Sequence, residues 1–221
     1  MLGLTLPSSP TALTAKGLIG LFQSILEFST LLETSPSQAT LSDETLAGRV
    51  SGDPQAFGEL YRRYLQRIYA YHLVRTGNVA AAQDLTSQTF LAALEGISSF
   101  RYQGSFAAWL LGIARHKIAD HYRHNPEMVE LEAAVDTPSP QPKLEEVVER
   151  GLRLEQVSQA LDNLLPERAE ALALRIFGQL SATDTGKVMK KSAGAVRTLV
   201  YRALQDLRQH LGVSGIEMED V

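Results

Sequence analysis

Apolar residues recur at intervals of three and four along residues 54–76, and this spacing is the strongest constraint on the fold. Tyr64, Ile68 and Tyr71 belong to the pattern, which places its apolar side chains on one face of an α-helix. An Asp-Pro pair, typical of a helix start, precedes the pattern, and Gly77, typical of a helix end, follows it. The segment is therefore expected to form one long helix.

Further apolar patterns are bounded by the same kinds of start and stop signals. A short capped helix is expected before Gly52, and other helices are expected to end at Gly96 and Gly178. Pro166 is expected in the first turn of another helix. Capping side chains that precede helices are Asn78, Ser105, Ser181 and Ser192. These signals together predict an all-α fold.

The helix after Asn78 has an apolar and a polar side. Leu85, Leu91 and Leu94 are expected to pack, while Asp84, Ser87 and Gln88 are expected to face outward. This polar side is a candidate surface for a partner protein.

A stretch with four prolines and many acidic residues divides the chain into two small helical domains. The expected parts are an amino-terminal extension with an amphipathic pattern (1–40), a helical domain (41–124), a flexible acidic linker (125–142), a helix-turn-helix domain (143–212) and a tail (213–221). The extension could pack on the protein, bind a partner or membrane surface, or form a loose tail.

Composition excludes several classes of protein. The 221 residues carry a formal net charge of −4 and no cysteine, so thiolate zinc sites and disulfides are excluded. No apolar stretch is long enough for a membrane span, which needs about 18 residues, and the cytoplasm is the expected location.

A cluster of histidines raises the question of a metal site. His116, Asp120, His121 and His124 are spaced at three to five residues. His116 and His121 lie far apart around a helix, however, and no second cluster is available to complete a coordination shell. We therefore expect no metal, no cofactor and no enzymatic activity.

The stretch 100–123 begins as a loop and becomes a helix at Ser105. Arg115 and Arg123 lie on one side of this helix, and Trp109 is expected to be exposed at the edge of that side. A basic face beside an aromatic side chain suits a nucleic-acid backbone and an unstacked base. A partly buried tryptophan with solvated arginines is the simpler alternative.

Residues 181–210 have the pattern of a helix-turn-helix. Ser181 and Asp184 predict a capping box for a short helix, and Ser192 caps a basic second helix after a brief turn. The first half of such a helix presents side chains to bases and phosphates. A DNA-binding regulator that acts without RNA polymerase is one function that fits, with the first domain as its sensor.

Five ordered pieces of the sequence resemble the bacterial RNA polymerase sigma factors. They are DPQAFGELYRRY, DLTSQTFLAAL, FRYQGSFAAWLLGIARHKIADHYR, LPERAEALALRIF and GQLSATDTGKVMKKSAGAVRTLVYRALQDLR. Their order and spacing are similar to the extracytoplasmic-function (ECF) group of the sigma-70 family, from about Leu41 to Leu211.

The resemblance implies a protein that directs core RNA polymerase to promoters and helps to open the DNA. The implied partners are the polymerase β′ clamp helices and β flap, promoter DNA and an anti-sigma factor, with no small-molecule substrate. The implied polymerase-binding residues are Asp84, Leu85, Gln88, Phe90 and Leu91. The implied −10 DNA-binding residues are Ser98, Ser99, Phe100, Arg101, Trp109, Arg115, His116, Lys117, Asp120 and Arg123. Those for the −35 element are Ser192, Ala193, Ala195, Arg197, Thr198, Tyr201 and Arg202.

The chain departs from the family pattern at a few positions. Gln88 replaces an acidic residue and His116 an asparagine, while Lys190 stands in the turn where glycine is usual. Thr185 and Gly186 stand where a branched apolar residue and alanine are usual. A glycine inside a helix is expected to cost about 1 kcal/mol relative to alanine.

Overall fold

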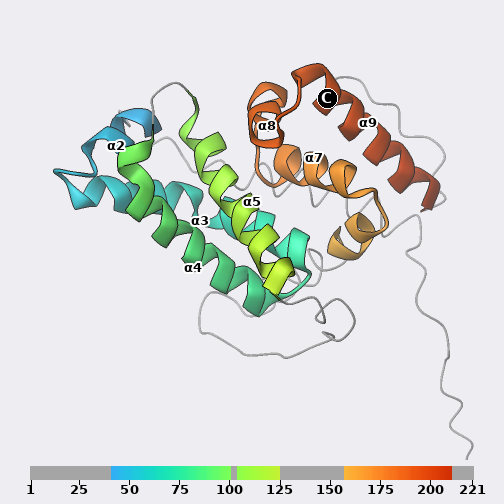
Figure 1. Ribbon diagram of the computed structural model, residues 1–221, viewed down its shortest axis with the longest axis horizontal. Coiled ribbons are helices and arrows are strands. Elements are labelled where there is room, and N and C mark those ends of the chain that lie inside the picture. Colours follow the sequence, from blue (N-terminus) through green and yellow to red (C-terminus); the bar gives the residue numbers. More distant parts are fainter. Residues whose placement is uncertain (1–40, 101–103, 125–156, 211–221) are drawn as a thin grey trace, which may run out of the picture.

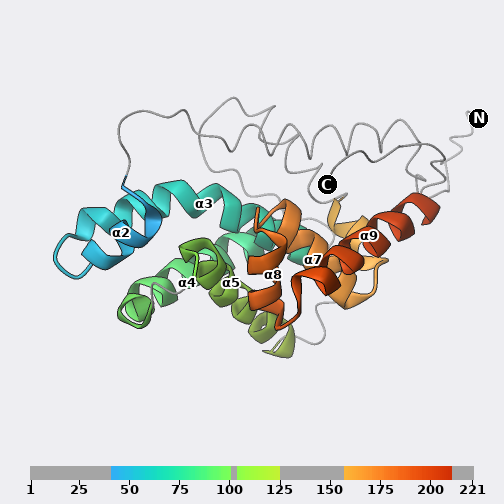
Figure 2. The same cartoon turned by 90° about the horizontal axis from the view of Figure 1, so that it is seen from above.

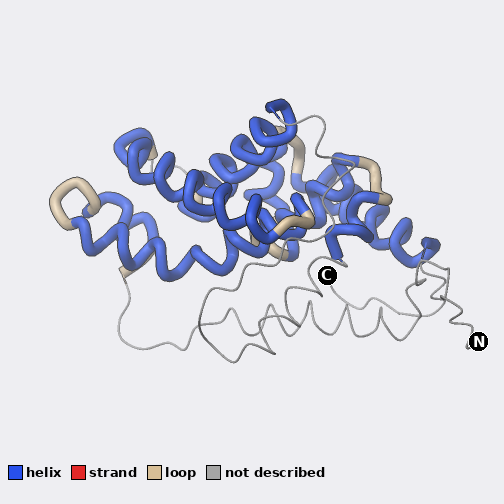
Figure 3. Tube along the Cα trace, turned by 90° about the horizontal axis from the view of Figure 1, so that it is seen from below, coloured by secondary structure: helices blue, strands red, loops and turns tan. Residues whose placement is uncertain are grey.

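The computed structural model describes residues 41–100, 104–124 and 157–210, and in these parts helices are joined by loops without strands (Figure 3). The first helical group is α2 (Asp43–Arg49), α3 (Pro54–Thr76), α4 (Val79–Gly96), the short 3-10 helix η1 (Ile97–Ser99) and α5 (Phe106–His124). The second helical group is α7 (Pro166–Ile176), α8 (Ala182–Met189) and α9 (Ala193–His210), preceded by helical residues 157–162. The all-α prediction is confirmed. The predicted extension 1–40, linker 125–142 and tail 213–221 lie outside the described residues.

The predicted helix starts are confirmed by hydrogen bonds from backbone N–H groups to capping side chains. Asn78 Oδ1 accepts from the Ala81 N–H at 2.8 Å. The other caps are Asp53 to Gln55 at 2.9 Å, Ser105 to Ala108 at 3.1 Å, Ser181 to Asp184 at 3.0 Å, and Ser192 to Ala195 at 3.1 Å. Each bond satisfies one of the free N–H groups in a first helical turn.

The end of α3 also follows the prediction. Gly77 has a φ of 63° and donates its N–H to the Leu73 carbonyl at 2.8 Å. This left-handed cap lets α4 turn back and pack along α3 (Figure 1).

Helix α3 is the centre of the first group, with α2, α4 and α5 all in contact with it (Figures 1 and 2). Leu60, Ile68 and Leu110 are fully buried in this core. Burial of a side chain of this size stabilises the fold by about 1.5–3 kcal/mol.

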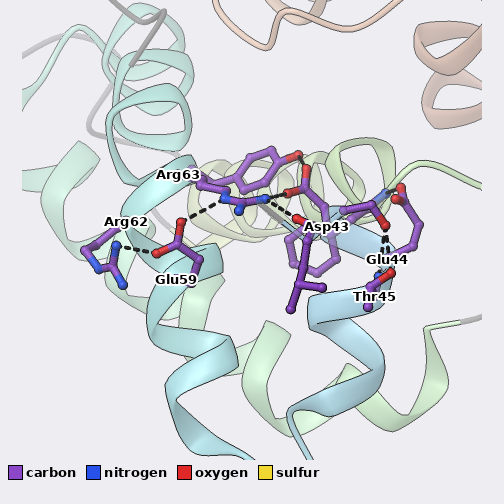
Figure 4. A network of polar contacts seen from close by, with 10 residues as sticks. Asp43, Glu44, Thr45, Glu59, Arg62 and Arg63 are labelled. Carbon is purple, nitrogen blue, oxygen red and sulfur yellow. Dashed lines mark hydrogen bonds and ion pairs between the residues drawn. The ribbon is translucent and has the colours of Figure 1, made fainter. Parts of the chain in front are cut away.

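A polar network attaches α2 to α3 (Figure 4). The Arg63 guanidinium donates to Asp43 Oδ1 at 2.6 Å and to Glu59 Oε1 at 3.0 Å. The Tyr64 hydroxyl donates to the other oxygen of Asp43. Arg63, which lies outside the apolar stripe of α3, therefore links α2 to α3.

The second group contains the predicted helix-turn-helix. Helix α9 packs against both α7 and α8, and Val196, Ala203 and Leu207 on its inner side are buried. Its other side faces away from these two helices and is exposed.

The two helical groups are in contact with each other. Helix α3 packs against α7 and helix α5 against α8 (Figure 2), and the buried residues of both groups form one continuous hydrophobic core. The sequence predicted two domains and a linker, and it did not predict this contact.

Candidate polymerase and nucleic-acid interfaces

One side of α4 carries the side chains predicted to bind polymerase. Asp84, Gln88 and Leu91 are exposed together on this side, and the Gln88 amide donates to Asp84 Oδ2 at 2.7 Å. The other two predicted residues, Leu85 and Phe90, are buried and pack beneath the surface. Leu85 and Phe90 can therefore support a polymerase-binding surface without forming its exposed part.

The expectation that Leu91 and Leu94 pack in the core is wrong. Leu91 is 57% exposed and Leu94 is 45% exposed. The inner face of α4 is formed instead by Leu85 and Phe90 together with small and polar residues. These small and polar residues are Ala82, Thr86, Thr89 and Ala93. Thr86 and Thr89 can be buried because their hydroxyls donate to carbonyls one turn earlier, each at 2.7 Å.

The sequence pattern did not predict that Tyr61 of α3 lies beside the candidate polymerase-binding surface of α4. It is 39% exposed, and its ring packs edge-on against Phe90, with centroids 4.7 Å apart. Tyr61, Leu91 and Leu94 are exposed apolar side chains on two helices that pack together. Exposure of large apolar side chains in this way is typical of a protein-binding surface.

The loop between α4 and α5 contributes both exposed and buried side chains. Ser98 and Ser99 are exposed in η1, and Ser99 Oγ donates to the Gly96 carbonyl at 2.6 Å. Phe100 is buried and packs on Phe106, with ring centroids 5.6 Å apart. Arg101 lies outside the described residues.

Trp109 is half-buried, which corrects the expectation of an exposed side chain. Its ring lies 5.4 Å from that of Phe100 and 5.5 Å from that of Phe106, measured between centroids. The three rings tie the loop to α5. Trp109 is thus partly available to a ligand and partly structural.

The predicted basic face of α5 is present. His116 and Arg123 are exposed, while Arg115 and Lys117 are half-buried. Arg123 pairs with Asp120 one turn away at 3.2 Å. Arg115 instead pairs with a residue of the second group, Glu170, at 3.5 Å.

The predicted face of α9 is open to a ligand. Six of the seven predicted residues are exposed and Ala193 is half-buried, and the seven are Ser192, Ala193, Ala195, Arg197, Thr198, Tyr201 and Arg202. Tyr201 accepts a hydrogen bond from the Gln205 amide at 2.8 Å. No ion pair that would neutralise Arg197 or Arg202 is found within the described residues.

The turn before α9 involves two of the departures from the family pattern, Lys190 and Gly186. Lys190 adopts the left-handed conformation with a φ of 56°, and the Lys191 N–H donates to the Gly186 carbonyl at 2.8 Å. A Cβ atom on Gly186 would lie 2.5 Å from the Lys191 carbonyl oxygen. The expected cost of a glycine inside α8 is therefore only part of the effect, because the turn needs the space that Gly186 leaves.

Comparison with known families identifies the family to which this chain belongs. Residues 60–126 match the family described as sigma-70 region 2, and residues 154–207 match the family described as sigma-70 region 4. The chain belongs to the sigma-70 family of RNA polymerase sigma factors. Region 2 thus corresponds to most of the first helical group, and region 4 to the second.

Individual sigma factors agree with this assignment. The chain is 38% identical over 164 residues to the ECF RNA polymerase sigma factor BldN of Streptomyces coelicolor, covering 73% of this chain and 62% of BldN. It is 32% identical over 158 residues to the RNA polymerase sigma factor YlaC of Bacillus subtilis, covering 69% of this chain and 90% of YlaC. The predicted ECF sigma-factor family is confirmed.

A solved structure supports the fold. The sigma factor RpoE from Bartonella quintana, in complex with the anti-sigma factor NepR, matches with a TM-score of 0.58 at 22% identity, covering 73% of this chain and 99% of that one. The roles of individual residues in this sigma factor remain predictions.

Two further properties bear on function. Among the helices described, none has the length and hydropathy of a membrane-spanning segment. Within the same residues, no group of three or more histidine and acidic side chains is arranged to hold a metal ion.

Proposed function

We propose that this sigma factor binds core RNA polymerase through α4, opens the −10 element through the loop and basic face at α5, and reads the −35 element through α9. The observation that carries the proposal is the exposure of these surfaces on different elements of one helical body. Each has the chemistry of its partner, since apolar side chains suit a protein and arginines suit phosphates.

The polymerase surface is proposed to combine Asp84, Gln88 and Leu91 with Tyr61 and Leu94. The exposed leucines lose water contact on binding, and the polar pair Asp84 and Gln88 lies beside them at the rim. The β′ clamp helices are the proposed partner for this surface, and the β flap is the proposed partner for region 4.

For the −10 element, the proposed DNA-binding side chains are Ser98, Ser99, Arg115, His116, Lys117 and Arg123. An unstacked base is proposed to pack near Trp109, whose side chain is half-buried. Opening of a duplex costs a few kcal/mol per extruded base, and stacking on an aromatic ring offsets about 1–3 kcal/mol of this.

We also propose the cytoplasm as the site of action and an anti-sigma factor as a partner. Two sigma factors of similar fold are described in complex with other proteins, CnrH with the cytosolic domain of CnrY, and RpoE with NepR. The proposed activity requires no catalytic group, metal or cofactor from this chain.

The test is transcription from genomic DNA fragments by core polymerase with and without the purified sigma factor. We expect transcripts that start at a defined set of promoters only when the sigma factor is present. Tight binding to duplex DNA without any association with core polymerase would contradict the proposal and favour the polymerase-independent regulator.

A further inference from the structure

Glu170 of α7 is a buried carboxylate, and its partners among the described residues all belong to region 2. It accepts a hydrogen bond from the Tyr71 hydroxyl at 2.8 Å. The Arg75 Nε lies 3.4 Å from Glu170 Oε2, and the Arg115 Nε lies 3.5 Å from Oε1. Residues from α3 and α5 therefore meet at one carboxylate of region 4.

Because Glu170 is buried, its charge depends on the contact between the two regions for its partners. Its side chain is 11% exposed, and that of Arg75 is 17% exposed. A carboxylate withdrawn from water is costly unless it is paired and hydrogen-bonded. All of the ionic partners of Glu170 in the described structure come from region 2, so separation of the two regions would leave it to be solvated by water.

We call the contact between regions 2 and 4 around Glu170 the seam. Other contacts extend the seam along α3 and α5. The Arg67 guanidinium is mostly buried and donates through Nε to the Gly178 carbonyl at 2.6 Å. Helix α5, which begins after Ser105, also packs against α8. In Figure 1, α8 accordingly lies beside α5.

The seam takes up part of the proposed −10 surface. Arg115 belongs to the basic face of α5 and is already paired with Glu170. A DNA phosphate that binds Arg115 must compete with this carboxylate. The exposed faces of α4 and α9, in contrast, include none of the residues of the seam.

We propose that Glu170 closes this sigma factor on itself, so that the free protein holds Arg115 away from DNA until regions 2 and 4 separate. The proposal rests on the function proposed above for α5. In the closed state α4 remains available to polymerase, whereas binding of DNA by α5 requires the bond between Glu170 and Arg115 to break.

Distance measurements test the closed state directly. The chain has no cysteine, so Gln66→Cys and Gln209→Cys, both at exposed positions, allow a spin label on each region of the full-length protein. Glu170→Gln should lengthen or broaden the distance distribution. Glu167→Gln is the matched control, because Glu167 is exposed on the same helix and pairs with Lys191 within region 4 at 2.8 Å.

Binding to a fluorescent pool of random single-stranded oligonucleotides tests the masking of Arg115. We expect Glu170→Gln to bind roughly tenfold more tightly than Glu167→Gln, a size typical of coupling between two sites. Arg75→Gln should also bind more tightly than the parent protein although it removes a positive charge. This direction separates loss of the closed state from a simple change in net charge.

Circular dichroism shows whether each variant is folded. If Glu170→Gln does not fold, Arg75→Gln serves as the test in its place. An unchanged distance distribution in the folded variants would overturn the proposal. Regions that separate without a gain in oligonucleotide binding would also overturn it. Failure of the proposed sigma-factor function is seen separately, as the absence of promoter-specific transcripts from all of these proteins with core polymerase.

Discussion

The imidazole of His72 and the hydroxyl of Thr89 lie 3.0 Å apart, fully enclosed between α3 and α4. Thr89 uses its only hydroxyl proton in a bond to the Leu85 carbonyl at 2.7 Å. The hydroxyl must therefore accept the bond from His72, which carries its proton on Nε2. The Nδ1 atom is buried and has no hydrogen-bond partner in the described parts of the chain.

His72 should make stability depend on pH. Burial, with the nearby His121, lowers the pKa of His72 from 6.5 to about 3. Below pH 6.5 the unfolded chain binds a proton at this site that the folded chain does not bind. Stability from this group is therefore complete above the unfolded pKa and is lost as pH falls toward the folded pKa.

The comparison with His72→Gln isolates this effect. Between about pH 7 and about pH 5, urea unfolding should show that the parent protein loses on the order of 2 kcal/mol more stability than the variant. The amide of glutamine can still donate to Thr89, but it does not titrate. Equal losses in the two proteins would show that His72 is not the group responsible.

Thr185 should be replaceable by valine with a gain in stability. Its side chain is fully buried in α8, and its hydroxyl has no hydrogen-bond partner among the described residues. Removal of an unsatisfied hydroxyl is expected to raise the free energy of unfolding by about 1 kcal/mol. Thr86→Val is the matched control, since Thr86 is also buried in a helix but donates to Ala82 at 2.7 Å. Denaturant melts in which both variants shift alike would contradict the prediction.

Gly186→Ala should destabilise the helix-turn-helix, although alanine favours helices. The added Cβ would meet the Lys191 carbonyl at 2.5 Å, and relief of such a contact typically costs about 1–3 kcal/mol. Gly58→Ala in α3 is the control, because no atom lies within 4 Å of its added Cβ. There the melting temperature should rise, in line with a gain of up to about 1 kcal/mol. A rise in both variants would mean that the turn relaxes around the new methyl group.

Features that depend on neighbouring residues could be predicted from the sequence. A cap such as Asn78 involves only its own helical turn, so residue type and spacing are sufficient. The face of α4 was harder to predict because Thr86 and Thr89 satisfy their own hydroxyls and form the inside, leaving Leu91 outside. Apolar character alone cannot reveal this arrangement.

Contacts between distant parts of the chain were not predictable in this way. Tyr71 and Glu170 are 99 residues apart in sequence, and neither belongs to a motif that names the other. Trp109 shows the same difficulty within the site, since its burial depends on where the loop places Phe100. Helix starts and ends were thus accessible from local pattern, whereas the seam and the buried face of α4 required the fold.

Leu91→Ala should weaken binding to core polymerase without loss of stability. The side chain is 57% exposed, so its truncation costs the free protein little, and alanine maintains the helix. Burial of the leucine against polymerase would give an affinity loss of about 1–2 kcal/mol on truncation. Leu41→Ala is the control, as another exposed leucine outside the proposed surface. Equal affinity of the two variants in a competition assay would remove Leu91 from the interface.

Arg197→Ala and Arg202→Ala should each reduce the salt dependence of binding to promoter duplex. Both arginines are exposed on α9, where a phosphate can displace counterions by pairing with them. The slope of log affinity against log salt should fall by about one unit for each arginine removed. Arg62→Ala removes another exposed arginine from α3, outside the proposed DNA surfaces, and should leave the slope unchanged. Because the three variants carry the same net charge, a slope that falls equally in all of them would indicate a general charge effect rather than contacts made by α9.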